Sequence, residues 1–250
     1  MKNLRPLLGV AIVIAGWLAL SAFHLLDPIF FSSPLEVASA LLRDFVGGHA
    51  IADLKVTVYR LFLGFTIGSL IGIAGGLLVG SFSKLSEYVQ APIDFLRSIP
   101  VACLFPFFML VFGLGDLSKV ATAAWSTTFV VLINTYYGVR VVSETRLRVT
   151  TAMHASLWKK YTWVVIPEAL PHIVAGMRIG VSLSLIVVLV TEMFMGTRIG
   201  LGKRIYDAAL IYDTPSMLAF ILLAGVIGFL TNGGFVLAEK KLTHWKNATK

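Results

Sequence analysis

The sequence predicts an all-α fold that crosses a membrane several times. Of its residues, 57% are hydrophobic and only 14% are charged, whereas a soluble domain carries about 25% charged residues. Several uncharged runs reach the roughly 20 residues that a helix needs to cross a hydrocarbon core. These runs are apolar throughout and lack the alternation of membrane-spanning strands, so we expect the spans to be helices.

Six apolar runs are the predicted spans, and four of them carry no interruption. The third contains Pro100 and Pro106, and the fifth contains Arg178 and Glu192. The basic start of the chain also fits a cleaved signal peptide, but the near-spanning length of the first run favours an uncleaved helix. In chain order, the predicted spans are residues 7–26, 61–83, 98–115, 120–139, 169–195 and 214–238.

Lysine and arginine are distributed unevenly between these spans. With the N-terminus inside, the inner segments hold thirteen of these cations and the outer segments hold seven. Loops rich in Lys and Arg stay on the cytoplasmic side, so both termini are expected there. The net charge of +8 then faces anionic lipid and gives no reason to expect nucleic acid as a partner.

Between the first two spans, apolar residues recur at helical spacing over residues 34–46, which predicts a helix lying along the membrane surface. No linker or low-complexity stretch divides the chain, so residues 1–250 are predicted to form a single domain.

Glycine recurs at every fourth position of the second span. This spacing leaves a stripe without side chains on one helical face, where another backbone can approach closely. The pattern predicts a packing seam, within the chain or between two copies, although general glycine enrichment of membrane helices is the simpler alternative. The seam residues are Gly64, Gly68, Gly72, Gly76 and Gly80.

The third span begins LRSIPVACLFPFF, and its two prolines each remove a backbone donor. Carbonyl groups freed in this way are tolerated at membrane depth only where protein or a water-filled cavity satisfies them. This span is therefore expected to face the protein interior or a solute pathway, with simple proline kinking as an equal alternative.

Motifs for catalysis are missing from the sequence. The stretch 200–204, GLGKR, lacks the first glycine of a phosphate-binding loop and has Arg204 where serine or threonine is required. The five histidines and Cys103 show no metal-ligand spacing. We therefore predict neither an enzyme nor a metal site.

Glu192 is an acid deep inside a predicted span. Charge in hydrocarbon is costly, so such a residue is a candidate for a solute pathway or a proton relay. The sequence offers no matching intramembrane base for a relay, and near the outer end of its span Glu192 can also reach water or a neighbouring helix.

A polar, basic segment, residues 148–173, separates the fourth and fifth spans with the sequence RVTTAMHASLWKKYTWVVIPEALPHI. Residues 149–161 have few helix breakers and predict one or two short helices outside the bilayer. Small residues such as Ala152 and Ala155 offer a surface that can insert into a groove of a soluble partner. A basic, aromatic loop lying on anionic lipid is the alternative.

This segment resembles the permease subunits of bacterial ATP-binding-cassette importers, in the branch that carries taurine, aliphatic sulfonates, nitrate or related small anions and pyrimidine precursors. Those permeases share the motif EAAxxLGASxWxxFxxVxLPxALPxI, which this chain matches at Ala155-Ser156, Trp158, Val164, Pro167, Ala169-Leu170-Pro171 and Ile173. Further similarity lies in LRSIPVACLFPFFMLVFGLGDLSK, NTYYGVR and GMRIGVSLS, and extends from about Arg60 to Trp245.

Two positions depart from the family motif. Arg148-Val149-Thr150 stands where the family has Glu-Ala-Ala, and His154 stands where it has glycine. Glycine adopts positive φ without steric cost. With His154 in its place, either the turn is made differently or the helix continues.

The resemblance implies a type I importer-like permease that works with other chains. Two copies form a homodimer in the bacterial inner membrane, two cytoplasmic ABC ATPase subunits hold ATP and Mg, and an extracytoplasmic binding protein delivers the solute. No cofactor is expected in this chain. ATPase closure is transmitted through a cytoplasmic loop at about residues 140–168, inside which the inserted residues are Thr151, Ala152, Met153, His154, Ala155, Ser156 and Leu157.

In the same framework, the candidate pathway or gate residues are Arg97, Pro100, Pro106, Ser182, Ser184 and Glu192. Two other classes remain open at this stage: a proton-driven secondary transporter that uses Glu192, and a membrane scaffold without a solute path.

Overall fold

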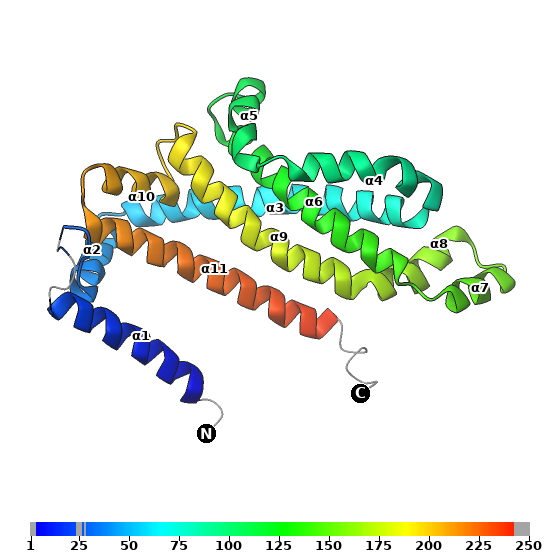
Figure 1. Ribbon diagram of the computed structural model, residues 1–250, viewed down its shortest axis with the longest axis horizontal. Coiled ribbons are helices and arrows are strands. Elements are labelled where there is room, and N and C mark those ends of the chain that lie inside the picture. Colours follow the sequence, from blue (N-terminus) through cyan, green and yellow to red (C-terminus); the bar gives the residue numbers. More distant parts are fainter. Residues whose placement is uncertain (1–3, 24–26, 28, 243–250) are drawn as a thin grey trace. The chain divides into compact units, whose positions relative to one another are not determined.

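The computed structural model describes residues 4–23, 27 and 29–242, and over these ranges it consists of helices and loops without a strand (Figure 1). The chain forms two compact units: Met1–Thr57 with Glu192–Ile227, and Val58–Thr191 with Gly228–Lys250. Three helices, α3 (His49–Ser81), α9 (Ile166–Phe194) and α11 (Thr214–Leu242), contribute residues to both units.

The first unit contains α1 (Leu4–Ala22), α2 (Pro34–Val46) and α10 (Leu201–Leu210). Its small core joins Val37 and Ala40 of α2 to Ala219 of α11. The predicted surface helix is present as α2, and a capping box defines its start: Ser33 N donates to a Glu36 carboxylate oxygen at 2.7 Å, and Glu36 N donates to Ser33 Oγ at 3.3 Å. These bonds, chiefly the one from the Ser33 backbone, hold the pKa of the exposed Glu36 below its ordinary value.

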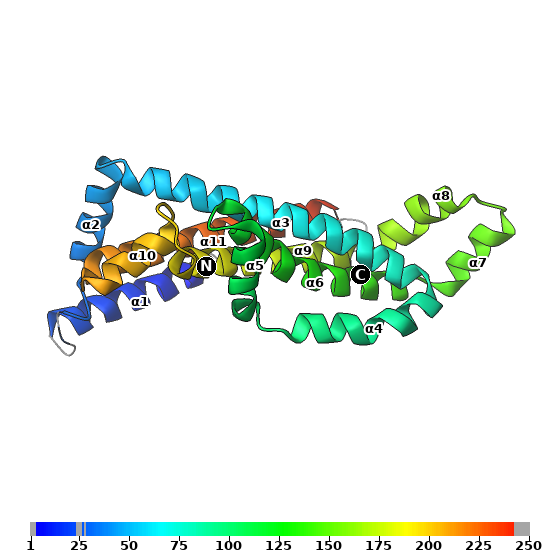
Figure 2. The ribbon, with the colours of Figure 1, turned by 90° about the horizontal axis from the view of Figure 1, so that it is seen from above.

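The second unit is built around α6 (Asp116–Arg140), which lies beside both α3 and α9 (Figure 2). The remaining elements of this unit are α4 (Ser83–Ser98), the 3-10 turn η1 (Val101–Leu104), α5 (Phe105–Phe112), α7 (Glu144–Ala152), α8 (Leu157–Lys160) and the π-helical turn η2 (Tyr161–Val165).

The five seam glycines of α3 face α6. A β-carbon at Gly68 would lie 2.5 Å from the carbonyl oxygen of Ala124, and one at Gly76 would lie 2.5 Å from Cβ of Thr135. Gly64, Gly72 and Gly80 leave equally little room, at 2.7 Å from the nearest α6 atom. The structure thus places the seam within one chain. Sequence reasoning missed its counterpart on α9, where the GxxxG pair Gly176 and Gly180 packs on α6.

In the described residues, fewer helices could span a membrane than the sequence predicted. In the described part of the chain, three helices are long and apolar enough to cross a membrane: α3, the continuous run Leu157–Phe194, and α11. The bent pair α4 and η1–α5 makes a fourth if it counts as one span. The predicted count of six is not confirmed. Leu8–Ala22 of α1 is apolar but short, and α6 buries polar residues such as Thr122, Thr127 and Thr135.

Two predicted boundaries need correction. The third span, predicted as residues 98–115, is not one helix, because the chain bends by 87° between Ser83–Ser98 and Val101–Phe112. Ile99 and Pro100 at the break are not helical, as expected before and at a proline. The second span begins earlier than predicted, at His49. Residues 24–26, the predicted end of the first span, and Trp245, the end of the family resemblance, lie outside the described residues.

Candidate functional site

The polar segment forms two short helices that are fixed at their base. Arg146 of α7 pairs with the Glu168 carboxylate of α9, which also accepts a hydrogen bond from Ser143 N at 3.1 Å. Beneath them, Val142, Val165 and Ala169 form a buried cluster. The carboxylate of Glu168 in α9 thus holds the start of α7 through two contacts.

The turn between α7 and α8 shows how the chain accommodates His154 at the position where the family has glycine. His154 has a φ of +49°, the left-handed conformation that glycine adopts at such turns. Its N–H donates to Thr151 O at 3.0 Å, and Ala155 N donates to Thr150 O at 3.0 Å, which together make a Schellman motif. The helix does not continue. His154 thus adopts the left-handed conformation that glycine takes in the family, and this conformation costs roughly 1–2 kcal/mol of conformational free energy.

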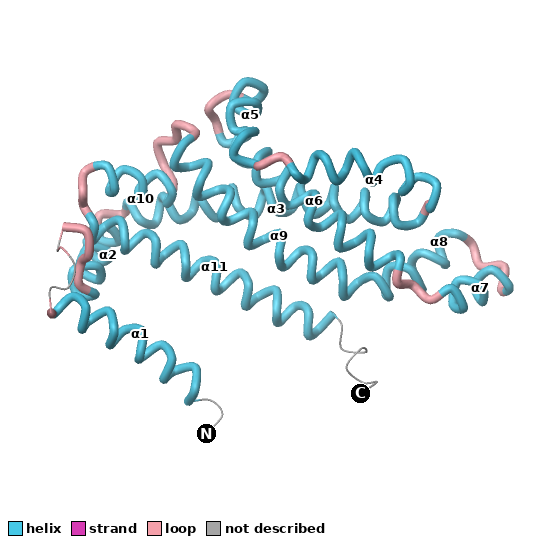
Figure 3. The backbone as a smooth tube through the Cα atoms, viewed as in Figure 1, coloured by secondary structure: helices cyan, strands magenta, loops and turns pink. Residues whose placement is uncertain are grey.

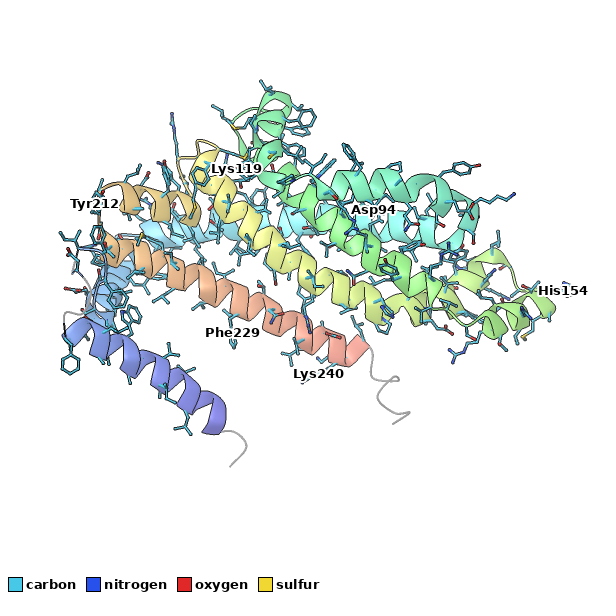
Figure 4. All side chains as sticks on the ribbon, viewed as in Figure 1. Asp94, Lys119, His154, Tyr212, Phe229 and Lys240 are labelled. Atoms are coloured by element: carbon cyan, nitrogen blue, oxygen red, sulfur yellow. The ribbon has the colours of Figure 1, made fainter. Side chains whose placement is uncertain are left out.

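Large apolar side chains are exposed at the tip of this turn. Met153, Leu157 and Trp158 are each about three-quarters exposed. Figure 3 shows the loop that joins α7 to α8, and Figure 4 places His154 at its outer end. Ser156 starts α8 by accepting a hydrogen bond from Lys159 N. Residues 151–157, which the sequence predicts as the coupling loop, thus present exposed apolar side chains such as Met153 and Leu157 on a fixed support.

A second candidate site is the hollow beside the proline break, which we call the Arg97 cavity. Its volume is about 360 Å³, within the range of small-ligand sites. Arg97 is the one charged residue of its lining, and the bend at Pro100 opens the space. The lining consists of Arg97, Ser98, Ile99, Pro100, Val101, Trp125, Ser126, Phe129, Val130, Ile133 and Leu183.

Of the six pathway candidates, only Arg97 and Pro100 line this cavity. Pro106 lies in the first turn of α5. Ser182 donates to the carbonyl of Arg178 one turn earlier, and the buried Ser184 donates to Leu61 O at 3.0 Å, which ties α9 to α3. The structure therefore brings together two of the six and uses Ser184 in helix packing.

Glu192 is the centre of a different arrangement in the first unit, which we call the Glu192 cluster. Its side chain is fully buried. Thr57 Oγ1 donates to its carboxylate at 2.9 Å, and Gly202 N donates to Oε2 at 2.9 Å. Glu192 thus accepts hydrogen bonds from α3 and from the N-terminus of α10, and the lining of the Arg97 cavity does not include it.

Sequence reasoning missed the partners of Glu192. Asp53 accepts from Gly200 N at 2.7 Å and from Arg204 Nε at 2.6 Å, and Thr57 accepts from Leu201 N at 2.9 Å. The three backbone amides that begin α10 are all occupied by side-chain oxygens of the chain itself. The glycine stretch that superficially resembled a phosphate loop is therefore a cap for α10. The i, i+4 spacing of Asp53 and Thr57 on one helical face was the available signal.

Two further charged residues stabilise the turn between α5 and α6. Arg60 pairs with Asp116 at 2.6 Å, and Lys119, which is 1% exposed, donates to the carbonyl oxygens of Leu114 and Gly115. The prediction counted Arg60 and Lys119 as loop charges. In the structure both are buried, and their bonds fix the turn between α5 and α6.

Helices with packed glycine seams, a broken helix beside a cavity and a protruding loop define the class of polytopic membrane transport proteins. The chain belongs to the binding-protein-dependent transport system inner membrane component family, which matches residues 50–244.

Two curated relatives align along most of their length. The putative aliphatic sulfonates transport permease of Bacillus subtilis is 30% identical over 98% of this chain and 88% of its own. The taurine transport system permease of Escherichia coli is 26% identical over 94% and 87%. Among solved structures, a chain of the inward-facing MetNI methionine ABC transporter aligns with a TM-score of 0.69 and 19% identity, over 78% of this chain and 96% of that chain. The all-α importer-permease fold is thereby confirmed.

Proposed function

We propose that this chain is the membrane-spanning permease subunit of an ATP-driven importer for a small anion, and that residues 1–250 act as one permease domain. Family membership and the names of the relatives, which transport aliphatic sulfonates, taurine and, in Synechococcus elongatus, bicarbonate, support the class of solute. The observation that carries the proposal is the coupling loop, an exposed apolar tip on a support that is bonded to α9.

In this proposal the energy comes from other subunits. Two copies of the permease pair in the bacterial inner membrane with both termini in the cytoplasm, and each coupling loop docks on one of two ATPase subunits, which bind ATP and Mg. An extracytoplasmic binding protein delivers the solute. Closure of the ATPases would push the loops, and the Glu168 contact would pass the movement to α9.

The first test changes the exposed tip. Met153→Asp puts a charge on a side chain that is 76% exposed, so the fold is preserved while the apolar contact is lost. We expect about a tenfold or greater loss of co-purified cognate ATPase, as for an interface hot spot, together with loss of ATP-driven uptake. Ala155→Arg should act in the same direction. Thr145→Arg, an exposed change near the start of α7, is the matched control and should leave both measurements unchanged.

The second test uses the left-handed turn. His154→Gly relieves the backbone strain and should keep ATPase binding and uptake, whereas His154→Val cannot adopt positive φ easily and should weaken both. If Met153→Asp retains the ATPase and uptake, or if His154→Val behaves like His154→Gly, the loop is not the docking element.

A further inference from the structure

The Arg97 cavity contains one cation and no acid. Arg97 is half exposed and lines the cavity wall, while Asp94, its ion-pair partner, does not belong to the lining. Asp94 lines a smaller adjoining hollow of about 180 Å³, together with Ser86, Gln90 and Tyr136, and Arg97 lines this hollow as well. Arg97 therefore borders both spaces, and of the two only the smaller one is also lined by its carboxylate partner.

The guanidinium retains unused hydrogen-bond donors. Arg97 Nε donates to Asp94 Oδ1 at 2.8 Å, and within the described ranges no acceptor is bonded to its two Nη groups. A guanidinium carries five N–H donors in a planar fork, which suits two oxygens of an anion. One edge of Arg97 is thus fixed by α4 itself, and the other edge is available to a ligand.

The rest of the wall is apolar. The two hydroxyl groups donate inside their own helices, Ser98 Oγ to Asp94 O at 2.6 Å and Ser126 Oγ to Ala123 O at 2.9 Å. Trp125, Phe129 and Leu183 belong to the same lining and supply aromatic and aliphatic surface. The cavity therefore offers an anion site next to aromatic and aliphatic surface, and little that would hold a second charge.

We propose that the Arg97 cavity binds organosulfonates with an apolar tail, with the sulfonate oxygens on the Nη groups of Arg97 and the tail against Trp125 and Phe129. This assignment rests on the proposed importer function and narrows its substrate class. Bicarbonate has no tail to bury against the wall. Taurine carries an ammonium group that the wall leaves without a carboxylate, and an unpaired charge in an apolar site is costly.

The test measures the charge of the cavity directly, without the ATPase or the binding protein. The single cysteine is removed by Cys103→Ser, and Ser126→Cys places a thiol in the wall. The full chain in lipid nanodiscs is treated with two methanethiosulfonates, one carrying a sulfonate and one a trimethylammonium group. Each rate is divided by the rate of the same reagent with free 2-mercaptoethanol.

We expect the sulfonate reagent to be favoured roughly tenfold, because the thiol lies near an incompletely neutralised cation. Arg97→Gln should abolish the preference, and Arg97→Lys, which keeps the charge, should retain much of it. A thiol at the exposed, non-lining position Tyr88, introduced as Tyr88→Cys, is the matched control and should show no change with Arg97→Gln.

Protection then defines the ligand class. 1-Propanesulfonate has nearly the size of taurine but a methyl group in place of the ammonium, so it should slow modification of Cys at 126 several-fold more than taurine or bicarbonate at equal concentration. Equal protection by all three solutes, or a reagent preference that survives Arg97→Gln, would overturn the proposal. Retention of ATPase binding and uptake by Met153→Asp would count against the proposed function and leave the cavity result standing.

Discussion

Two charged residues at the ends of helices, Glu192 in the last turn of α9 and Arg97 in the last turn of α4, have opposite surroundings. The carboxylate of Glu192 is fully buried and bonded to Thr57 and to the amide of Gly202. The guanidinium of Arg97 is half exposed, lines a cavity and uses one edge for Asp94. A buried charge whose bonds are all made inside the protein stabilises structure, whereas a charge with unused donors on a cavity wall can bind a ligand.

Charge alone does not show whether a residue of this kind is structural or binds a ligand. Both residues were candidates for the pathway, Glu192 because charge in a predicted span suggests function and Arg97 because of the family resemblance. Their partners separate them: the oxygens of Glu192 and Asp53 cap α10, whereas Arg97 lines a cavity whose other residues are uncharged. The number of satisfied bonds, more than the charge itself, distinguishes a structural ion from a binding group.

The largest effect is expected at Glu192. Glu192→Ala leaves Thr57 and Gly202 N without their buried acceptor, so the variant should lose about 3 kcal/mol of stability, near the upper end for unsatisfied buried groups. The thermal unfolding midpoint in detergent measures this. We expect Glu192→Gln to retain ATP-dependent uptake of solute. If it abolished uptake without lowering the midpoint, Glu192 would act in transport.

A slightly smaller effect is expected at Gly200, which has a φ of +144° and no space for a side chain. A β-carbon there would lie 2.5 Å from the carboxyl carbon of Glu192. Gly200→Ala should destabilise the protein by about 2 kcal/mol, through overpacking and backbone strain. Gly225→Ala is the matched control, since no atom lies within 4 Å of its new β-carbon, and it should be neutral or stabilising. Equal midpoints for the two variants would contradict the tight Glu192 cluster.

At Arg97 the expected stability change is small. Its ion pair with Asp94 is half exposed, and such pairs contribute about 0–1 kcal/mol. Arg97→Gln should therefore keep nearly the wild-type unfolding midpoint while uptake falls, the reverse of Glu192→Gln. A large drop in the midpoint would show that Arg97 supports the fold and would remove the contrast between the two residues.

The smallest effect belongs to the exposed carboxylate Glu36. Its pKa in the folded protein is lowered, mainly by the hydrogen bond from Ser33 N. The stabilisation is therefore present above the ordinary pKa and is lost as the pH falls through the lowered value. Glu36→Gln should remove this dependence, so wild type and variant should differ in unfolding midpoint at neutral pH and converge in acid. Parallel pH profiles would rule out the contribution.

Much of the fold could be predicted from local pattern. The glycine ladder from Gly64 to Gly80 marked a close helix contact, and the spacing of residues 34–46 gave the surface helix. Span counting was less successful, because hydropathy does not register that α6 buries its threonines between α3 and α9. The break at Pro100 was visible as proline chemistry, but the size of its bend was not.

At the functional sites, the sequence alone indicated the membrane class, the predicted coupling loop and Glu192 as a charge within a span. Those properties depend on composition and on neighbours within a few turns. Only the tertiary structure decided which charge is satisfied. Glu192 and Thr57 are separated by 135 residues, so their hydrogen bond exists only in the folded chain. Hydrogen-bond satisfaction is a property of atoms that folding brings together, which is why the roles of Glu192 and Arg97 became distinct only in three dimensions.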